Sequence, residues 1–468
     1  MFAAIETRCG LLAVLALAWA GASSALLAAD AAGPPWPGTS LRVGLAQVRI
    51  TPEGPIRMSG YASRNKPSEG VLTELYAKAM AIEDAKGGRA VLLTADLIGF
   101  RRPLAEAICQ GIEQKTGLKR PQILLNGSHT HTGPVVGMID PKQEGVPEDE
   151  RRQVEAYSQR LQGQLPGLAA AALDALQPAK LSWGIGVANL VMNRREFTER
   201  DVRLGVNPRG YADRSVPVLR VDTPEGKLRA VVFGCACHNT TLTGEHYVLS
   251  GDYAGFAQQH VQQQHPDVQA MFMIGCGADA NPYPRGTIEA AKQHGAELGT
   301  EVCRVLGTEL RPIGGPLRVE LEHVELPLQP VPSREQLEQM NKGPSHIKYN
   351  AVRMLEAVKR NEPLPTHYRA PVAVWQFGED LTLVALPGET VSEFVPLVEK
   401  ALGPRRLWVA GYSNDVFGYL VTAKIIAEGG YETRGLFEEV GFFSPQTQDV
   451  LLAKVRQLAE KAGRALPE

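Results

Sequence analysis

The chain alternates between two patterns of apolar and polar positions. Short apolar runs, many of them rich in Val, Ile and Leu, predict buried β-strands at residues 41–50, 90–95, 123–125, 216–221, 230–235, 268–274, 381–386 and 407–410. Segments with helical spacing of apolar residues predict α-helices between them at residues 103–115, 148–176, 253–264, 287–306, 349–360, 390–402 and 446–465. Strands interleaved with helices predict an α/β fold of layered β-sheets flanked by helices. Pro166 is expected to break the helix predicted over residues 148–176.

The N-terminus has the pattern of a targeting segment. Arg8 precedes an apolar run over residues 11–19, and small residues follow that run. This order predicts a signal peptide over residues 1–29, followed by a Pro/Gly-rich lead-in over residues 30–40. An uncleaved membrane anchor is the alternative. Because the run is short and no later stretch reaches about 18 apolar residues, we expect export to the periplasm or the extracellular space, without stable membrane insertion.

Composition and charge exclude several classes of protein. Hydrophobic residues make up 44% of the chain and charged residues 21%, so a mainly disordered chain is excluded. The net charge is −2, which leaves no electrostatic footprint for nucleic acid. The five cysteines after the predicted signal peptide are interpreted as buried small apolar residues: Cys109, Cys235, Cys237, Cys276 and Cys303.

Residues with chemical potential follow directly after several predicted strands. The strand-like runs ILLN, VVFGCAC, LVALPG and LWVAGYSND are followed by His129 and His131, by His238, by Glu389 and by Tyr419. In open α/β sheets, ligands bind beyond the carboxyl ends of the strands. We therefore expect these segments to converge on one site at the strand ends.

The two histidines of His129-Thr130-His131 are the sharpest local signal. On an extended segment, residues two apart project to the same side and can reach one metal or one substrate. His238 offers a further nitrogen ligand, and the alternative is a core histidine bonded to a carbonyl. Glu389 is predicted at a helix N-terminus, where the dipole keeps a carboxylate ionised, and the alternative is a helix cap.

An ordered set of motifs over residues 41–435 resembles the neutral/alkaline (non-lysosomal) ceramidases. The matching segments are ITPEGPIRMSGYASR, LLNGSHTHTGP, VMNRRE, ACHNTTLTGEHYVLSGDYAGFA, GCGADANP, LPGET, GYLVT and EGGYE. The resemblance implies a hydrolase in which a zinc-activated water attacks an amide (N-acyl) bond. It implies that Zn²⁺ is held by His129, His238, Glu389 and Tyr419. It also implies that the scissile amide is polarised and bound by His131, Arg194 and Tyr431.

Two departures from the family pattern affect the substrate. Ala280 occupies the position of the family's catalytic serine, and an alanine offers no hydroxyl. The chain also ends where full ceramidases continue into a C-terminal β-sandwich, so residues 41–468 are expected to form the catalytic domain alone. The leading hypothesis is an exported, ceramidase-like zinc hydrolase acting on a small-molecule or lipid-like N-acyl substrate. The alternatives are a hydrolase of a non-sphingolipid amide or ester, and a non-catalytic zinc- or ligand-binding relative. The sequence leaves the oligomeric state open.

Overall fold

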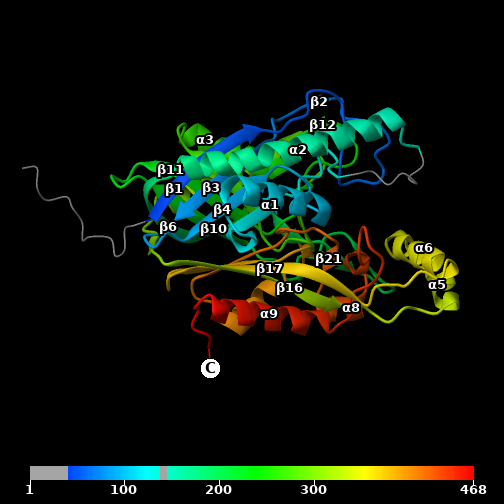
Figure 1. Ribbon diagram of the computed structural model, residues 1–468. Helices are drawn as coiled ribbons and strands as arrows, with labels where there is room; N and C mark the ends of the chain where they lie inside the picture. Colours follow the sequence, from blue (N-terminus) through cyan, green and yellow to red (C-terminus); the bar gives the residue numbers. More distant parts are fainter. Residues whose placement is uncertain (1–40, 138–144, 468) are drawn as a thin grey trace, which may run out of the picture. The chain divides into compact units, whose positions relative to one another are not determined.

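A mixed β-sheet forms the centre of the fold. The computed structural model describes residues 41–137 and 145–467, so the predicted signal peptide and lead-in lie outside the described residues. Within the described residues, the largest sheet has nine strands (Figure 1). In spatial order they are β13 (Gln269–Ile274), β11 (Leu228–Cys235), β10 (Ser215–Asp222), β6 (Gln177–Val187), β1 (Leu41–Arg49), β3 (Tyr76–Glu83), β4 (Arg89–Ala95) and β5 (Ile123–Gly127), with β15 (Arg311–Ile313) paired to β6. Neighbours are antiparallel except for the parallel pairs β4–β5 and β11–β13.

The two faces of this sheet enter two different cores, because successive side chains of a strand point to opposite faces. In β3, Ala77 and Ala79 belong to the core beneath helices α1 (Arg102–Thr116) and α2 (Glu148–Asp174). Met80 and Ile82 of the same strand belong to a core on the opposite face. Both faces of β3 are therefore buried, which explains its nearly continuous apolar sequence.

A second, smaller sheet covers the opposite face. Its four strands in the described residues are, in order, β16 (Leu317–Pro327), β17 (His367–Phe377), β18 (Leu381–Ala385) and β20 (Leu407–Ala410). Only β18 and β20 are parallel neighbours among these described strands. The core between the two sheets includes Trp183 from the large sheet and Trp375 and Trp408 from the small one.

Helices cover the outer faces of both sheets. On the large sheet they are α1, α2, α3 (Asp252–Gln264) and α4 (Ile288–Leu306), and on the small sheet α9 (Thr447–Lys461) with α7 (Phe394–Leu402) beside it. Figure 1 shows α2 and α9 on opposite sides of the two sheets. The expected α/β fold of layered sheets flanked by helices is confirmed.

Short elements complete the described chain. Four two-stranded ribbons pair β2 (Gly70–Val71) with β12 (Val248–Leu249), β7 (Val191–Asn193) with β14 (Ala280–Pro282), β8 (Arg195–Phe197) with β9 (Val202–Leu204), and β19 (Glu389–Thr390) with β21 (Tyr419–Leu420). The remaining helical segments are η1 (Arg120–Gln122), α5 (Arg334–Met340), α6 (Ser345–Lys359), α8 (Ala423–Glu428) and η2 (Tyr431–Thr433). No helix of the described chain is long and apolar enough to cross a membrane.

Two helix predictions need correction. Pro166 does not break α2, which continues through it to Asp174. The proline ring lies against Gly111 of α1, where a Cβ atom would approach Pro166 Cγ to 2.6 Å. The glycine thus lets the two helices approach closely enough to bury the proline. The helix expected from residue 390 begins only at Phe394, because residues 389–390 form strand β19.

The interpretation of the cysteines as buried residues is confirmed for four of the five, and Cys303 is the exception. All five cysteines named above are free thiols, four of them buried and Cys303 partly exposed. Burial raises the pKa of the Cys109 thiol to about 11 and that of the Cys235 thiol to about 12. Both thiols therefore stay protonated at neutral pH and act as packing residues.

Candidate active site

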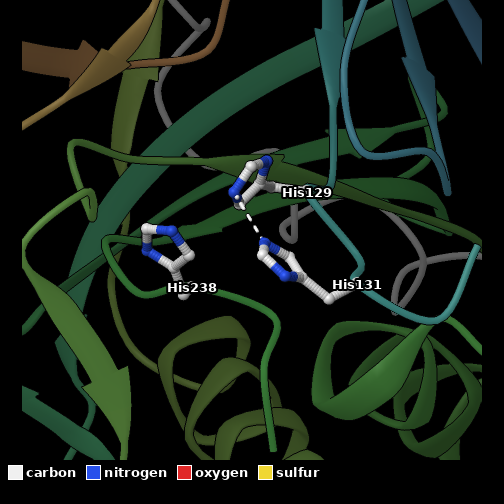
Figure 2. Close-up of side chains that lie close together, drawn as sticks. All are labelled: His129, His131 and His238. Carbon is white, nitrogen blue, oxygen red and sulfur yellow. Dashed lines mark hydrogen bonds between the residues drawn. The ribbon is translucent and has the colours of Figure 1, made fainter. Parts of the chain in front are cut away.

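Three histidines meet at the carboxyl ends of strands in the large sheet. His129 and His131 follow β5, and His238 follows β11 (Figure 2). His129 is not extended as expected but has a φ of 62°, in the left-handed region. The two side chains nevertheless converge, with 3.0 Å between His131 Nε2 and His129 Nε2. One nitrogen of each of the three histidines lies within 4.8 Å of the others.

The backbone carbonyls around the site fix the tautomers of two histidines. His129 Nδ1 lies 2.6 Å from the Ile98 carbonyl oxygen, and His238 Nδ1 lies 2.8 Å from the Gly277 carbonyl oxygen. A carbonyl oxygen only accepts, so each Nδ1 carries a proton and each Nε2 faces the site. Metal-binding histidines are commonly oriented by such a bond.

Glu389 adds a carboxylate to this cluster. Its Oε2 lies 3.1 Å from His238 Nε2 and 3.4 Å from His129 Nε2. Burial alone would raise the pKa of Glu389, but His129 and His238 hold it well below its usual range. Burial and Arg194 lower the pKa of His238 to about 3, so that histidine is neutral near pH 7.

The Glu389 carboxylate and the Nε2 atoms of His129 and His238 therefore face one another in one buried cluster. Nitrogen and carboxylate ligands are those that zinc prefers. The residues present fit a metal ion on this ground.

The reason given for the ionisation of Glu389 is wrong. Glu389 lies in the two-residue strand β19, five residues before α7 begins, so no helix dipole acts on it. Pairing of β19 with β21 places Glu389 opposite Tyr419 in a parallel register. The strand pairing, rather than a helix terminus, positions this carboxylate.

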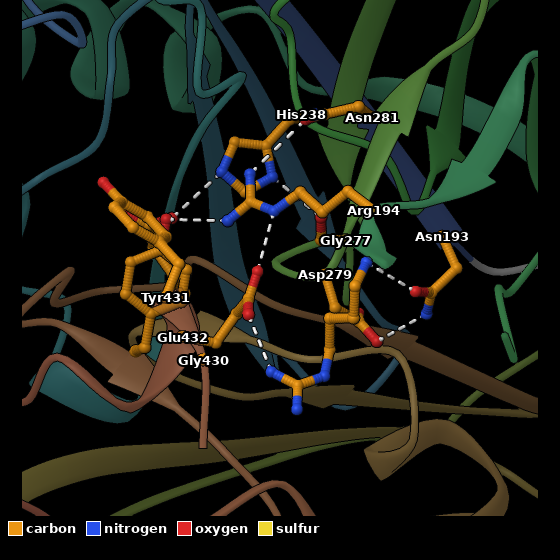
Figure 3. A network of polar contacts seen from close by, with 12 residues as sticks. Asn193, Arg194, His238, Gly277, Asp279, Asn281, Gly430, Tyr431 and Glu432 are labelled. Carbon is orange, nitrogen blue, oxygen red and sulfur yellow. Dashed lines mark hydrogen bonds and ion pairs between the residues drawn. The ribbon is translucent and has the colours of Figure 1, made fainter. Parts of the chain in front are cut away.

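Arg194 lies beside His238 and bonds to Tyr419 and Glu432 (Figure 3). The residue lies between β7 and β8, and its Nη2 donates to the Tyr419 hydroxyl at 3.0 Å. Tyr431 contributes its ring, whose centroid lies 5.7 Å from that of Tyr419 and 5.7 Å from Arg194 Cζ. The Tyr431 hydroxyl accepts a bond from Arg434 at 2.6 Å.

All seven residues singled out from the sequence thus occupy one region, but in two groups. The side-chain donors of His129, His131, His238 and Glu389 converge directly. The hydroxyl of Tyr419 meets Arg194 instead. His131 lies among the nitrogen atoms that could hold a metal, whereas the sequence assigned it to catalysis.

The N-terminal motif positions His131. Gly60 has a φ of 94°, and a Cβ atom there would lie 2.4 Å from His131 Cγ. The Tyr61 ring packs against His131 at 5.1 Å between centroids. Arg64 Nη1 donates both to the His131 carbonyl oxygen and to that of Ser59. The motif MSGYASR therefore acts by holding His131 from outside the sheet.

The sequence profile of the neutral/alkaline non-lysosomal ceramidases, N-terminal, matches residues 41–282, just over half of the chain. The chain belongs to this family. It is 23% identical over 246 residues to neutral ceramidase A of Dictyostelium discoideum, covering 50% of this chain and 33% of that protein. It is 23% identical over 239 residues to the neutral ceramidase of Pseudomonas aeruginosa, covering 47% of this chain and 33% of that protein.

A family member of known structure shares the fold. The crystal structure of neutral ceramidase from Pseudomonas aeruginosa has a TM-score of 0.69 and 20% sequence identity, covering 92% of this chain and 76% of that one. A ceramidase complexed with C2 gives a TM-score of 0.69 at 19% identity, with the same two coverages. The sequence matches span about a third of the length of the curated relatives.

Two buried carboxylates beside the site were missed in the sequence. Glu432, which is 1% exposed, accepts from Arg194 Nε at 2.9 Å and from Arg195 Nη1 at 2.8 Å. Asp279 accepts from the backbone and hydroxyl of Ser392 at 2.7 and 2.9 Å, and burial raises its pKa to about 6. Both lie in quoted motifs, EGGYE and GCGADANP, so an acidic residue inside a motif was the available signal.

Ala280 adjoins the histidine cluster through its backbone. Its carbonyl oxygen accepts from the His238 N–H at 3.0 Å, and its Cα pairs with that of Asn193 between β14 and β7. The side chain is fully buried. The position is therefore part of the site region and offers no side-chain hydroxyl there.

Proposed function

We propose that the protein is an exported zinc-dependent hydrolase that cleaves an amide (N-acyl) bond in a small-molecule or lipid-like substrate. The observation that carries the proposal is the buried convergence of two histidine nitrogens and a carboxylate at His129, His238 and Glu389. Membership of a family whose relatives are named neutral ceramidases supports the amide as the bond attacked.

His129, His238 and Glu389 would hold the zinc ion, and Tyr419 would complete the set. Burial and Glu389 raise the pKa of Tyr419 well above its usual value, and the Arg194 guanidinium, which donates to the Tyr419 hydroxyl, opposes that shift. Zinc bound there would supply Lewis-acid chemistry, lowering the pKa of a water to about 7. The segments after β5 and β11 and the β19–β21 ribbon would together orient these four side chains.

Proton transfer is assigned to His131. Burial and the two neighbouring histidines lower its pKa well below the usual value, so the ring is neutral and able to accept a proton. Its Nδ1 has no hydrogen-bond partner among the described residues. His131 would take a proton from the attacking water and deliver it to the nitrogen that leaves with the amine product.

Arg194 and Tyr431 would bind the substrate. Glu432 and Tyr419 raise the pKa of Arg194 well above its usual value despite complete burial, so the guanidinium is permanently charged. A fixed cation of this kind stabilises negative charge on a carbonyl oxygen during attack. The Tyr431 ring lies within 6 Å of both Tyr419 and Arg194 and forms a wall for the substrate.

A non-sphingolipid amide or ester is the second candidate substrate. The buried Ala280 offers no hydroxyl beside His238, so any mechanism that needs a serine at this position is excluded. The metal-holding residues are independent of this position. Hydrolysis by an activated water therefore remains available for acyl groups other than a ceramide's.

Metal analysis tests the metal assignment. The purified protein, loaded with zinc and desalted, should hold about one zinc ion per chain, as a single site of this ligand type does. His129→Ala and His238→Ala should each lose that zinc while keeping the circular dichroism spectrum of the folded protein. Full zinc content in both variants would overturn the metal assignment.

A substrate panel tests the reaction. The zinc-loaded protein is assayed on ceramides, on other N-acyl amides and on esters of the same acyl groups. Release of fatty acid from at least one amide, abolished in His129→Ala, supports the proposal. Cleavage of esters alone would favour the second candidate, and no cleavage by a fully zinc-loaded protein would leave a binding protein.

Export rests on residues 1–29, outside the described residues. The N-terminus of the mature protein, sequenced after expression in a bacterium with its own leader, should begin near residue 30. Mature protein that still begins at Met1 would contradict export by cleavage.

A further inference from the structure

Tyr412 places a buried hydroxyl without a partner in the active-site region. The residue follows β20 and precedes β21, and its side chain is 0% exposed. Its hydroxyl makes no hydrogen bond to any part of the chain that the structure describes. An unpaired buried hydroxyl is destabilising, and a catalytic role is one reason for a native structure to keep it.

The ring of Tyr412 packs against the histidine cluster. Its centroid lies 4.5 Å from that of His129 and 6.1 Å from that of His238. The Tyr412 ring is therefore part of the wall around the histidines.

The backbone at Tyr412 is held in a conformation that tyrosine rarely adopts. Its φ is 52°, in the left-handed region, and Asn414 two residues later has a φ of 66°. The left-handed region is unfavourable for a residue with a side chain. The Tyr412 N–H donates to the Gly388 carbonyl oxygen at 3.0 Å, and the Asn414 N–H donates to the Leu125 carbonyl oxygen at 2.8 Å.

These bonds tie the loop to Gly388, directly before β19, and to Leu125 in the middle of β5, which restrains the Tyr412 ring. Strained, over-determined backbone of this kind collects at functional sites. The strain, the unpartnered hydroxyl and the packing on two histidines are three separate observations. Each is expected if the ring is held there to present its hydroxyl to a ligand.

We propose that Tyr412 is a catalytic residue whose hydroxyl donates a hydrogen bond to the carbonyl oxygen of the scissile amide. The inference rests on the proposed function and adds to it a donor that no family motif supplied. The carbonyl oxygen gains negative charge as the carbon is attacked, so the bond strengthens along the reaction. No proton is transferred, and the O–H bond of Tyr412 stays intact throughout.

The test compares Tyr412→Phe with Tyr157→Phe. Both replacements keep the buried ring and remove one hydroxyl. Tyr157 is the matched control because its hydroxyl donates to the Ile50 carbonyl oxygen at 2.9 Å, in α2 and away from the histidines. Losing that bond should lower the melting temperature of the control, although the Ile50 carbonyl oxygen keeps a bond from Arg160 Nη2 at 3.0 Å.

Tyr412→Phe should have the opposite effects on melting temperature and on turnover. Its melting temperature in the metal-free state should equal or exceed that of the wild type, because an unpaired hydroxyl is removed. Its turnover on the best N-acyl substrate should fall about 10²–10³-fold, as for a lost oxyanion donor. Zinc content should stay unchanged. Tyr157→Phe should show the lower melting temperature with turnover within about twofold.

Two results would overturn the proposal: turnover of Tyr412→Phe within threefold of wild type, or a fall in its melting temperature equal to that of Tyr157→Phe. If the wild type cleaves no amide, the proposed function fails separately. Calorimetric titration with N-hexanoyl ethanolamine then decides the matter for Tyr412. A dissociation constant raised about fivefold or more in Tyr412→Phe, the worth of about one hydrogen bond, supports the donor. An unchanged constant, or no binding to either protein, overturns it.

Discussion

Replacing Glu432 by Gln should both destabilise the protein and disable Arg194. Glu432 is the carboxylate that holds the guanidinium groups of Arg194 and Arg195, at 2.9 and 2.8 Å. All three side chains are at most 5% exposed. The glutamine is nearly isosteric but neutral, so two buried cations lose their shared counter-charge.

The size of the loss in stability depends on which partners the two arginines keep when Glu432 is replaced. Arg195 keeps Glu428 at 3.1 Å, whereas Arg194 keeps only the Tyr419 hydroxyl at 3.0 Å and the Asn281 side-chain oxygen at 3.4 Å. Breaking a buried ion pair from one side costs about 3–5 kcal/mol. For a chain of 468 residues, an unfolding entropy near 2.1 cal/mol/K per residue makes that about 3–5 °C in melting temperature.

Glu428→Gln is the matched control. Glu428 contacts the same Arg195 but is 23% exposed, and Arg195 keeps Glu432 when it is lost. Its replacement should cost less than about 1 kcal/mol. Calorimetry, zinc content and turnover are measured on both variants. Glu432→Gln should lose at least about tenfold in turnover, since Arg194 is no longer oriented, while retaining zinc. Equal melting temperatures and equal turnover in the two variants would refute the reasoning.

Two further predictions concern His131 and Lys78. His131→Gln should lower turnover by about 10²–10⁴-fold and leave zinc content intact; loss of zinc in atomic absorption would instead make His131 a ligand. Burial lowers the pKa of Lys78 to about 8, with Asp96 opposing the shift. Between pH 8 and the unfolded value of 10.5 the unfolded chain binds more protons, so stability should rise with pH there, by about 3 kcal/mol. Urea unfolding of the metal-free protein gives the free energy of unfolding of wild type and of Lys78→Met. The wild-type value minus the variant value should increase by that amount over this pH range. A value that does not change with pH would contradict the buried ammonium.

The sequence predicted where the site would form better than how its residues are held. His129, His238 and Glu389 come directly after apolar strands, and strands that end at one edge of a fold bring the residues after them together. The left-handed φ of His129 was not predictable, because it depends on a bond from its N–H to Leu97 in another segment. The pattern of residues around His129 gives no information about a hydrogen-bond partner in another segment.

Glu389 and Tyr412 illustrate two further limits. A two-residue strand such as β19 is too short for any periodicity, so Glu389 was assigned to the helix that begins after it. Tyr412 lies in a loop without a motif, and only the packed structure reveals that its hydroxyl lacks a partner. Long strands were missed for another reason: β16 carries charged residues at alternate positions and resembles a polar segment.

The parallel strand pairs explain why the site lies between the two sheets. Both of these sheets are mainly antiparallel, and within the described chain their parallel neighbours are β4–β5, β11–β13 and β18–β20. The histidines follow strands of the large sheet, and Tyr412 follows β20 of the small one. Glu389 and Tyr419 lie in the β19–β21 ribbon, whose strands come after β18 and β20 in the chain.

Asn126, the fourth residue of β5, joins all three pairs. Its side-chain oxygen accepts from the Ile274 N–H of β13 at 2.9 Å, and its amide donates to the Gly411 carbonyl oxygen after β20 at 2.9 Å. The side chain is fully buried, so these bonds are shielded from water. Site residues that come from both sheets keep their mutual distances only while the two sheets hold a fixed relative position. The Asn126 amide helps to hold that position because it bonds to β13 and to the residue after β20. The apolar core between the sheets, which includes Trp183 and Trp375, helps as well.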